Sequence, residues 1–136
     1  MTVGLAATLA AVNYIPRADP AVSENSNRVV SYNGIYTVYY KSELDPIPAN
    51  VEHRWTLHME KKGAGLALDN ARIFVSGFMV ADGHPMPVRP RADRMLGNGN
   101  YLVQGLQFDR PGEWIVYFYI NFGSDYDTAE VHVTVK

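Results

Sequence analysis

The feature that most constrains this chain is a series of short runs rich in β-branched and aromatic residues, each bounded by turn signals. The first run is short and six more follow it: 28–31, 35–42, 51–60, 71–80, 101–108, 114–122 and 128–136. Several alternate apolar with polar residues, as a strand with one buried face does. No segment after residue 12 keeps a helical period. The pattern predicts an all-β domain.

We therefore expect an immunoglobulin-like antiparallel β-sandwich of about seven strands over residues 28–136. Gly99-x-Tyr101-x-Val103, with Asp93 upstream, has the form of the tyrosine corner that opens a late strand in such sandwiches. Val103 stands where antibody domains place a disulfide cysteine, which fits a chain without cysteine. A chain of 136 residues is long enough for one domain with a real core and too short for two.

Two local expectations accompany this fold. In the run 51–60, Trp55, Leu57 and Met59 alternate with polar residues that include His58, which predicts one solvent-facing side. Between the runs 71–80 and 101–108, proline, arginine and glycine predict a long loop without a strand.

Residues 1–27 are expected to form an apolar segment and linker outside the sandwich. The run 3–12 has about the length of the apolar region of a signal peptide but lacks a basic start. It is also shorter than the roughly 20 residues that span a bilayer. An export-signal or anchor remnant, a docking segment and a plain first strand or helix stay equally open. Any membrane contact is expected through residues 1–12 only.

Composition argues against several function classes. The formal net charge of −2 gives no reason to expect nucleic acid, because binding there rests on neutralising phosphates with lysine and arginine. The absence of cysteine excludes disulfides, thiolate zinc sites and cysteine nucleophiles. No nucleophile elbow, phosphate-binding loop or zinc-protease motif is present. We expect a protein that is not an enzyme.

Two runs, 71–80 and 114–122, are apolar on both faces, whereas a half-solvated sheet has one polar face. Either they are central strands flanked by long side chains, or one face contacts a partner protein or the N-terminal segment. The candidate interface consists of four aromatic residues: Phe74, Phe78, Tyr117 and Tyr119.

A loop after the run 71–80 gathers soft metal ligands. His84 and Met86 lie two residues apart, and Met79 precedes them. Imidazole suits copper and zinc, and thioether sulfur suits Cu(I), so these three residues are the candidate metal site. Alternatively, the loop is a rigid turn whose Met86 fills the end of the sandwich. The densest group of positive charges consists of Arg89, Arg91, Arg94 and Arg110. This group either binds an anionic partner or a phosphate, or it lies in a solvated loop.

Several segments together resemble the YtkA-like/FixH-like group of small bacterial extracytoplasmic domains, over roughly residues 33–135. The matching segments are Asn33-Gly34-Ile35-Tyr36-Thr37-Val38, Trp55-Thr56-Leu57, Asp69-Asn70-Ala71-Arg72-Ile73, Met79-Val80-Ala81-Asp82-Gly83-His84-Pro85-Met86-Pro87, Gly99-Asn100-Tyr101 and Gly112-Glu113-Trp114. In that group the loop usually reads Met-x-x-His-Gly-His-x-Met-Pro, and here Asp82 stands at the first histidine. The resemblance implies an immunoglobulin-like sandwich outside the cytoplasm, often near copper-handling or respiratory-oxidase assembly systems.

Two functional hypotheses follow. The first is a non-catalytic extracytoplasmic accessory subunit, in the periplasm or at the cell surface, that docks a larger, membrane-associated or respiratory assembly. The alternative is a copper-binding or copper-delivery module that uses the His84-Pro85-Met86 loop. The missing histidine and the doubled apolar faces favour the accessory role. In that role the expected protein partner is a larger complex or a second copy of the chain, and copper is the one cofactor considered.

Overall fold

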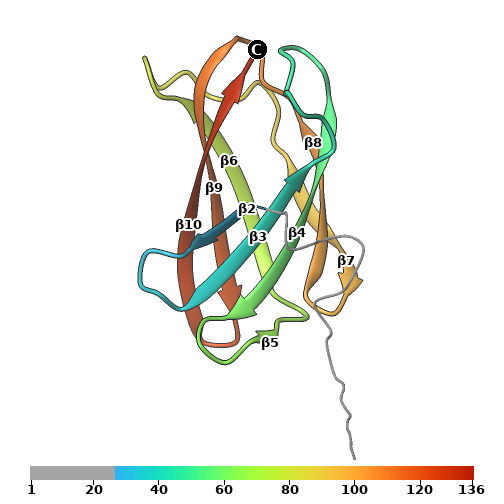
Figure 1. Ribbon diagram of the computed structural model, residues 1–136, viewed down its shortest axis with the longest axis vertical. Coiled ribbons are helices and arrows are strands. Elements are labelled where there is room, and N and C mark those ends of the chain that lie inside the picture. Colours follow the sequence, from blue (N-terminus) through green and yellow to red (C-terminus); the bar gives the residue numbers. More distant parts are fainter. Residues whose placement is uncertain (1–26) are drawn as a thin grey trace, which may run out of the picture.

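The computed structural model describes residues 27–136, and this part of the chain is all-β (Figure 1). It contains nine strands and no helix: β2 Asn27–Val30, β3 Tyr36–Ser42, β4 His53–Lys61, β5 Leu66–Ala67, β6 Arg72–Met79, β7 Arg91–Gly97, β8 Asn100–Leu106, β9 Gly112–Phe122 and β10 Asp125–Val135. Within this range no helix is long and apolar enough to cross a lipid bilayer. The expectations for residues 1–26, including the apolar run and the linker, lie outside the described residues.

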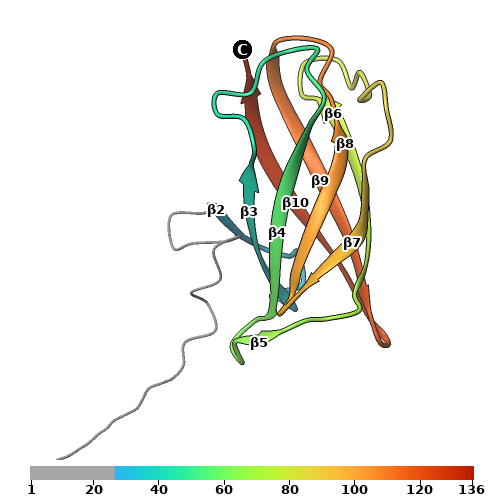
Figure 2. The same cartoon turned by 90° about the vertical axis from the view of Figure 1, so that its right-hand side faces the viewer.

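All strand pairs are antiparallel, in the order β10-β9-β6-β7-β8-β4-β3-β2, and β5 pairs with β4. The sheet folds over so that β10, β9 and β6 lie across from β3, β4 and β8 (Figure 2). Its two ends approach each other, because the Tyr32 N–H donates to the Thr128 carbonyl at 2.9 Å. The result is a nearly closed, sandwich-like barrel. The all-β antiparallel prediction is confirmed.

The core lies between the two layers and follows from the alternation of the strands. Four side chains of β9 are fully buried: Trp114, Val116, Phe118 and Ile120. The side chains between them lie half-buried on the outer face. Across the barrel, Trp55 of β4 contacts Phe118 with ring centroids 6.2 Å apart. Burying one such large side chain stabilises the fold by about 1.5–3 kcal/mol.

The expected loop between residues 80 and 101 contains strand β7, so that prediction is wrong. Most β7 side chains are exposed, and Ala92 is the one buried residue. The strand forms because its backbone pairs with β8, opposite Leu102 and Tyr101. The turn to β8, Gly97-Asn98-Gly99, has three successive positive φ angles of 93°, 54° and 77°. An exposed strand carries no alternation signal, which is why the sequence pattern missed it.

The predicted solvent-facing side of β4 is also wrong over its second half. His58 and Glu60 are buried, and His58 Nε2 lies 2.9 Å from Glu60 Oε2. The other ring nitrogen, Nδ1, lies 2.9 Å from Asn100 Oδ1. His58, Glu60 and Asn100 therefore form a buried polar cluster where a solvent-exposed face was predicted.

Tyr101 is buried as expected, but its contacts differ from the predicted corner. Its hydroxyl donates to the Leu68 carbonyl and accepts the Ala71 N–H at 3.0 Å. Asp93 takes no part, since it pairs with Arg91 at 3.3 Å on the surface. The two hydrogen bonds of the Tyr101 hydroxyl thus link the start of β8 to the segment between β5 and β6.

Candidate functional site

The four predicted interface residues lie together on the outer face of β6 and β9. The ladder sets Phe74 opposite Tyr119 and Phe78 opposite Ile115. The Phe78 and Tyr117 rings lie 6.2 Å apart, and Tyr117 stacks on Tyr119 at 6.1 Å. Phe74 is 58% and Phe78 37% exposed, whereas both tyrosines are half-buried. We call these four residues the aromatic face.

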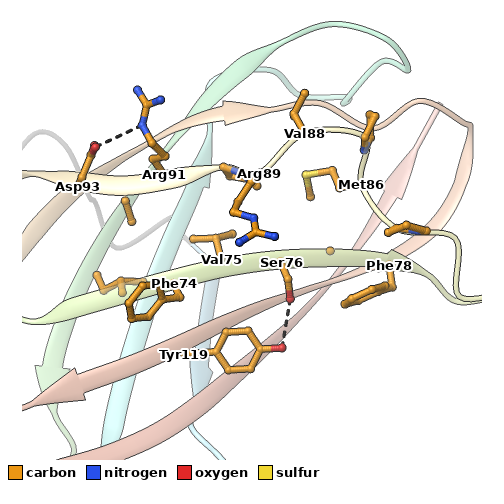
Figure 3. Close-up of a pocket in the computed structure, with 16 residues that line it drawn as sticks. Phe74, Val75, Ser76, Phe78, Met86, Val88, Arg89, Arg91, Asp93 and Tyr119 are labelled. Atoms are coloured by element: carbon orange, nitrogen blue, oxygen red, sulfur yellow. Dashed lines mark hydrogen bonds and ion pairs between the residues drawn. The ribbon is translucent and has the colours of Figure 1, made fainter.

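A groove of about 830 Å³ opens beside the aromatic face (Figure 3). Its walls are residues 73–78 of β6, the segment 85–93 and the ring of Tyr119. Phe74, Phe78 and Tyr119 therefore belong to both the aromatic face and the groove. Val88, 41% exposed, adds apolar surface from the opposite wall.

Polar groups in the groove are few. The Ser76 hydroxyl lies 3.1 Å from the Tyr119 hydroxyl on the β6 wall. Figure 3 shows the Arg89 side chain reaching from its loop towards β6, whereas Arg91 turns away to Asp93. Among residues 27–136, no carboxylate forms an ion pair with Arg89. The groove therefore combines apolar walls with one arginine that has no acidic partner among residues 27–136.

The loop that carries the predicted metal ligands is held by backbone hydrogen bonds at the end of β6. The Met79 N–H donates to the His84 carbonyl at 2.8 Å, and the Gly83 N–H donates to the Met79 carbonyl at 3.0 Å. Further along, the Met86 N–H donates to the Gly77 carbonyl at 2.9 Å. The loop is therefore a tight turn that continues the edge of β6.

The His84 ring faces a neighbouring loop. Its Nε2 lies 2.9 and 3.0 Å from the two carboxylate oxygens of Asp109, so Nε2 carries a hydrogen and donates. This hydrogen bond lowers the pKa of Asp109 from its ordinary value. The ring also meets the edge of Trp114 at 6.1 Å. Nδ1 is then the nitrogen left for another ligand.

The two methionines of the candidate metal site point to different strands. Met86 is buried, and its Cε packs over Gly77, where a Cβ would come within 2.4 Å. The Met79 Cε lies over Gly112, 3.0 Å from a Cβ built there. The structure thus places His84, Met86 and Met79 in one turn while their side chains contact different neighbours. In the described part of the chain, no three histidine or acidic side chains are grouped to hold a metal ion.

The remaining histidines have structural partners. His53 is buried and accepts the Trp55 indole N–H at 3.1 Å, while its Nδ1 lies 3.0 Å from the Val51 carbonyl. His132 is exposed and pairs with Glu130.

Two polar features escaped the sequence prediction. Arg89 was one of a group of loop arginines, and nothing in the order of residues distinguishes the one that reaches the groove. The pairing of His58 with Glu60 could have been predicted, because residues two apart in a strand lie on the same face.

Searches for similar proteins found no match to any family model, any curated protein or any solved structure.

Proposed function

We propose that this chain is a non-catalytic accessory subunit that docks a larger protein assembly outside the cytoplasm through the aromatic face. The observation that carries the proposal is an exposed aromatic surface continuous with a groove on one side of the sandwich. Contiguous apolar surface on a small domain commonly marks a contact site. The extracytoplasmic location rests on the resemblance to the YtkA-like/FixH-like domains.

The chemistry of the face suits protein contact. Large aromatic residues carry much of the binding energy at protein interfaces when they become buried. Phe74 and Phe78 stand on a central strand, held between β9 and the 85–93 segment, so little ordering is needed when a partner binds.

The test is photo-crosslinking in cells that produce the chain. A photoreactive phenylalanine analogue replaces Phe74 in one variant and Leu66, 62% exposed on β5, in the control. We expect a covalent adduct of defined mass from position 74 and none from position 66. Adding Phe78→Asp should reduce the adduct about tenfold. Equal adducts from both positions, or none from 74, would contradict the proposal.

We infer copper binding at the His84 loop as a second candidate function. One observation favours it: Nε2–H of His84 donates to Asp109, and histidines that bind metal commonly donate their other ring N–H to a carboxylate. Cu(I) would then bind Nδ1, and Met86 would have to leave Gly77 to supply its sulfur.

A Cu(I) titration against a competing chelator tests this candidate. Stoichiometric binding with a Kd below about 1 µM, equivalent to about −8 kcal/mol, should be lost in His84→Ala. The matched control is His132→Ala, on the surface of β10. Binding that does not depend on His84 would exclude this loop as a copper site.

A further inference from the structure

Part of the outer face of β3, β4 and β8 is buried. The Val38–Met59 pair points into the core, so the side chains that alternate with these two point outwards. Five outward-pointing side chains are nonetheless 8% exposed or less: Thr37, Tyr39, His58, Glu60 and Asn100. We call these five residues the polar patch. Further along the same face Lys41 and Arg54 are exposed, so the burial is confined to one end of it.

In the described part of the chain, no strand forms a layer over the polar patch. All nine strands belong to one sheet, and β10, β9 and β6 lie across from β3, β4 and β8 on the core side (Figure 2). Side chains that point away from the core of a two-layer sandwich normally meet water and are exposed. The low exposure of the polar patch therefore requires a cover.

The chain outside the described part joins the domain close to the polar patch. Residues 1–26 precede Asn27, which begins β2 and pairs with Tyr40 of β3. β4 lies two strand spacings from β2, which is about 10 Å at about 4.8 Å each. Ten extended residues reach up to about 33 Å. The residues that precede Asn27 are therefore long enough to cross β3 and reach β4 and β8.

The charges of the two parts are complementary. The polar patch contains the carboxylate of Glu60, whose Oε2 lies 2.9 Å from His58 Nε2. An ionised carboxylate has two oxygens and accepts several donors, so a guanidinium can bind it together with His58. Residues 1–26 contain a single basic residue, Arg17, ten positions before Asn27. Arg17 is therefore the cation that this segment can bring to Glu60.

We propose that residues 13–26 dock across the outer face of β3, β4 and β8 and cover the polar patch, with the Arg17 guanidinium on the Glu60 carboxylate. Tyr14 and Ile15, which lie just before Arg17 in the sequence, supply apolar surface for the ring of Tyr39. The N-terminal segment is thus assigned to the layer opposite the aromatic face. The aromatic face stays available to a partner protein, so this inference is independent of the proposed docking function.

Paramagnetic broadening in the full chain, labelled with ¹⁵N, tests where the segment lies. Because the chain has no cysteine, Ala18→Cys accepts a nitroxide label at one site. We expect the amide signals of Tyr39 and His58 to broaden more than those of Phe78 and Ile115, which pair in the opposite layer. Stronger broadening at Phe78 than at Tyr39, or broadening at none of these amides, would overturn the proposal.

Neutral variants test the ion pair. Arg17→Gln should lower the ratio of docked to undocked segment about tenfold, because a charge-assisted hydrogen bond is lost. Arg72→Gln, an exposed arginine of β6, is the matched control and should leave the ratio unchanged. In a Glu60→Gln chain, Arg17→Gln should change the ratio less than about twofold. If Glu60→Gln does not fold, the comparison of Arg17→Gln with Arg72→Gln decides. Equal effects of these two variants would exclude Arg17 as the partner of Glu60.

Mixed samples distinguish one chain from two. A nitroxide-labelled chain without ¹⁵N is mixed with a ¹⁵N-labelled chain without nitroxide. Broadening of Tyr39 in this mixture would assign the polar patch to the N-terminal segment of a second copy, and the intramolecular proposal would fail. A crosslink from position 74 to a partner reports on the aromatic face alone, so the docking function stands or fails separately.

Discussion

At the scale of single residues, two buried tyrosines differ in what their hydroxyls meet. The Tyr101 hydroxyl donates to the Leu68 carbonyl and accepts the Ala71 N–H. The Tyr36 hydroxyl is fully buried without a hydrogen-bond partner in the described chain. Burial raises the pKa of Tyr36, and the charge of Asp125 adds to the effect. A buried polar group without a partner lowers stability, whereas a satisfied one contributes to it.

We expect Tyr36→Phe to raise the free energy of unfolding by about 0.5–1 kcal/mol, because it removes an unsatisfied hydroxyl. Tyr101→Phe should lower that free energy by about 1–3 kcal/mol, because it leaves the Leu68 carbonyl and Ala71 N–H unpaired. Urea unfolding followed by tryptophan fluorescence measures both changes. A loss of stability in Tyr36→Phe equal to that in Tyr101→Phe would show that the Tyr36 hydroxyl is bonded.

Gly99 makes a second prediction at this scale. Its φ is 77°, and a Cβ there would lie 2.7 Å from the Met59 carbonyl oxygen, a backbone atom that cannot turn aside. We expect Gly99→Ala to lower the free energy of unfolding by about 3 kcal/mol. Gly63→Ala is the control, since φ is 84° and nothing lies within 4 Å. That control should cost about 1 kcal/mol. Equal losses in thermal unfolding would refute the steric argument.

At the scale of elements, Asp127 joins the turn between β2 and β3 to the start of β10. Its buried carboxylate accepts the backbone N–H groups of Asn33 at 2.9 Å and Thr128 at 2.9 Å. Burial alone would raise the pKa of Asp127, but hydrogen bonds from Ser31, Thr128, Asn33 and Ile35 outweigh it. The pKa lies below its ordinary value.

This arrangement gives the stability a defined pH dependence. A folded-state pKa below the unfolded value of about 4 means that ionised Asp127 stabilises the fold above about pH 4, and that this contribution is lost as pH falls through the folded pKa. We expect Asp127→Asn to lower the free energy of unfolding by about 3 kcal/mol at pH 7. The difference from the native chain should shrink below about pH 4.

Urea unfolding at pH 7 and at about pH 3 measures this difference, with exposed Asp125→Asn as the control. The control should change stability by less than about 1 kcal/mol at both pH values. A difference for Asp127→Asn that stays constant with pH would contradict a role for the charge.

The elements that sequence predicted are those whose two faces differ in environment. In β9 and β10, side chains alternate between the core and the outer face, and the run of residues records that alternation. β7 was missed because nearly all of its side chains meet solvent, so its existence depends on backbone pairing with β8. Backbone hydrogen bonds do not restrict which residue types a strand contains when its side chains face solvent instead of a core.

The candidate site was predictable to the same extent. Phe74 and Phe78 were placed on one face from their spacing, because that face follows from period two. The orientations of the Met79 and Met86 side chains could not be predicted from the sequence. Met79 packs over Gly112 of β9 and Met86 over Gly77 of β6, and these contacts depend on the fold. The limited pairing of β6 with the segment that follows it also depends on the path of residues 86–90, which no local pattern specifies.

At the scale of the whole molecule, the barrel closes through a seam of isolated hydrogen bonds, with no strand ladder, between the turn that follows β2 and the start of β10. The Tyr32 N–H donates to the Thr128 carbonyl at 2.9 Å, and the Tyr32 hydroxyl donates to Glu130. The second bond raises the pKa of Tyr32 to about 12 and, together with the bond from His132, lowers the pKa of Glu130. By contrast, β9 and β10 pair along their full length. The seam should therefore open without the rest of the barrel unfolding.

Hydrogen exchange of the native chain tests this separation. We expect Tyr32→Phe to lower the opening free energy of the amide at position 32 by up to about 1 kcal/mol, or about fivefold faster exchange, because the bond to Glu130 is lost. The amide of Val116, in the buried centre of β9, should keep its exchange rate. Tyr126→Phe, an exposed tyrosine of β10, serves as control and should leave both amides unchanged. If the amides at 32 and 116 changed together, seam opening and global unfolding would be the same event, and the barrel would open as one cooperative unit.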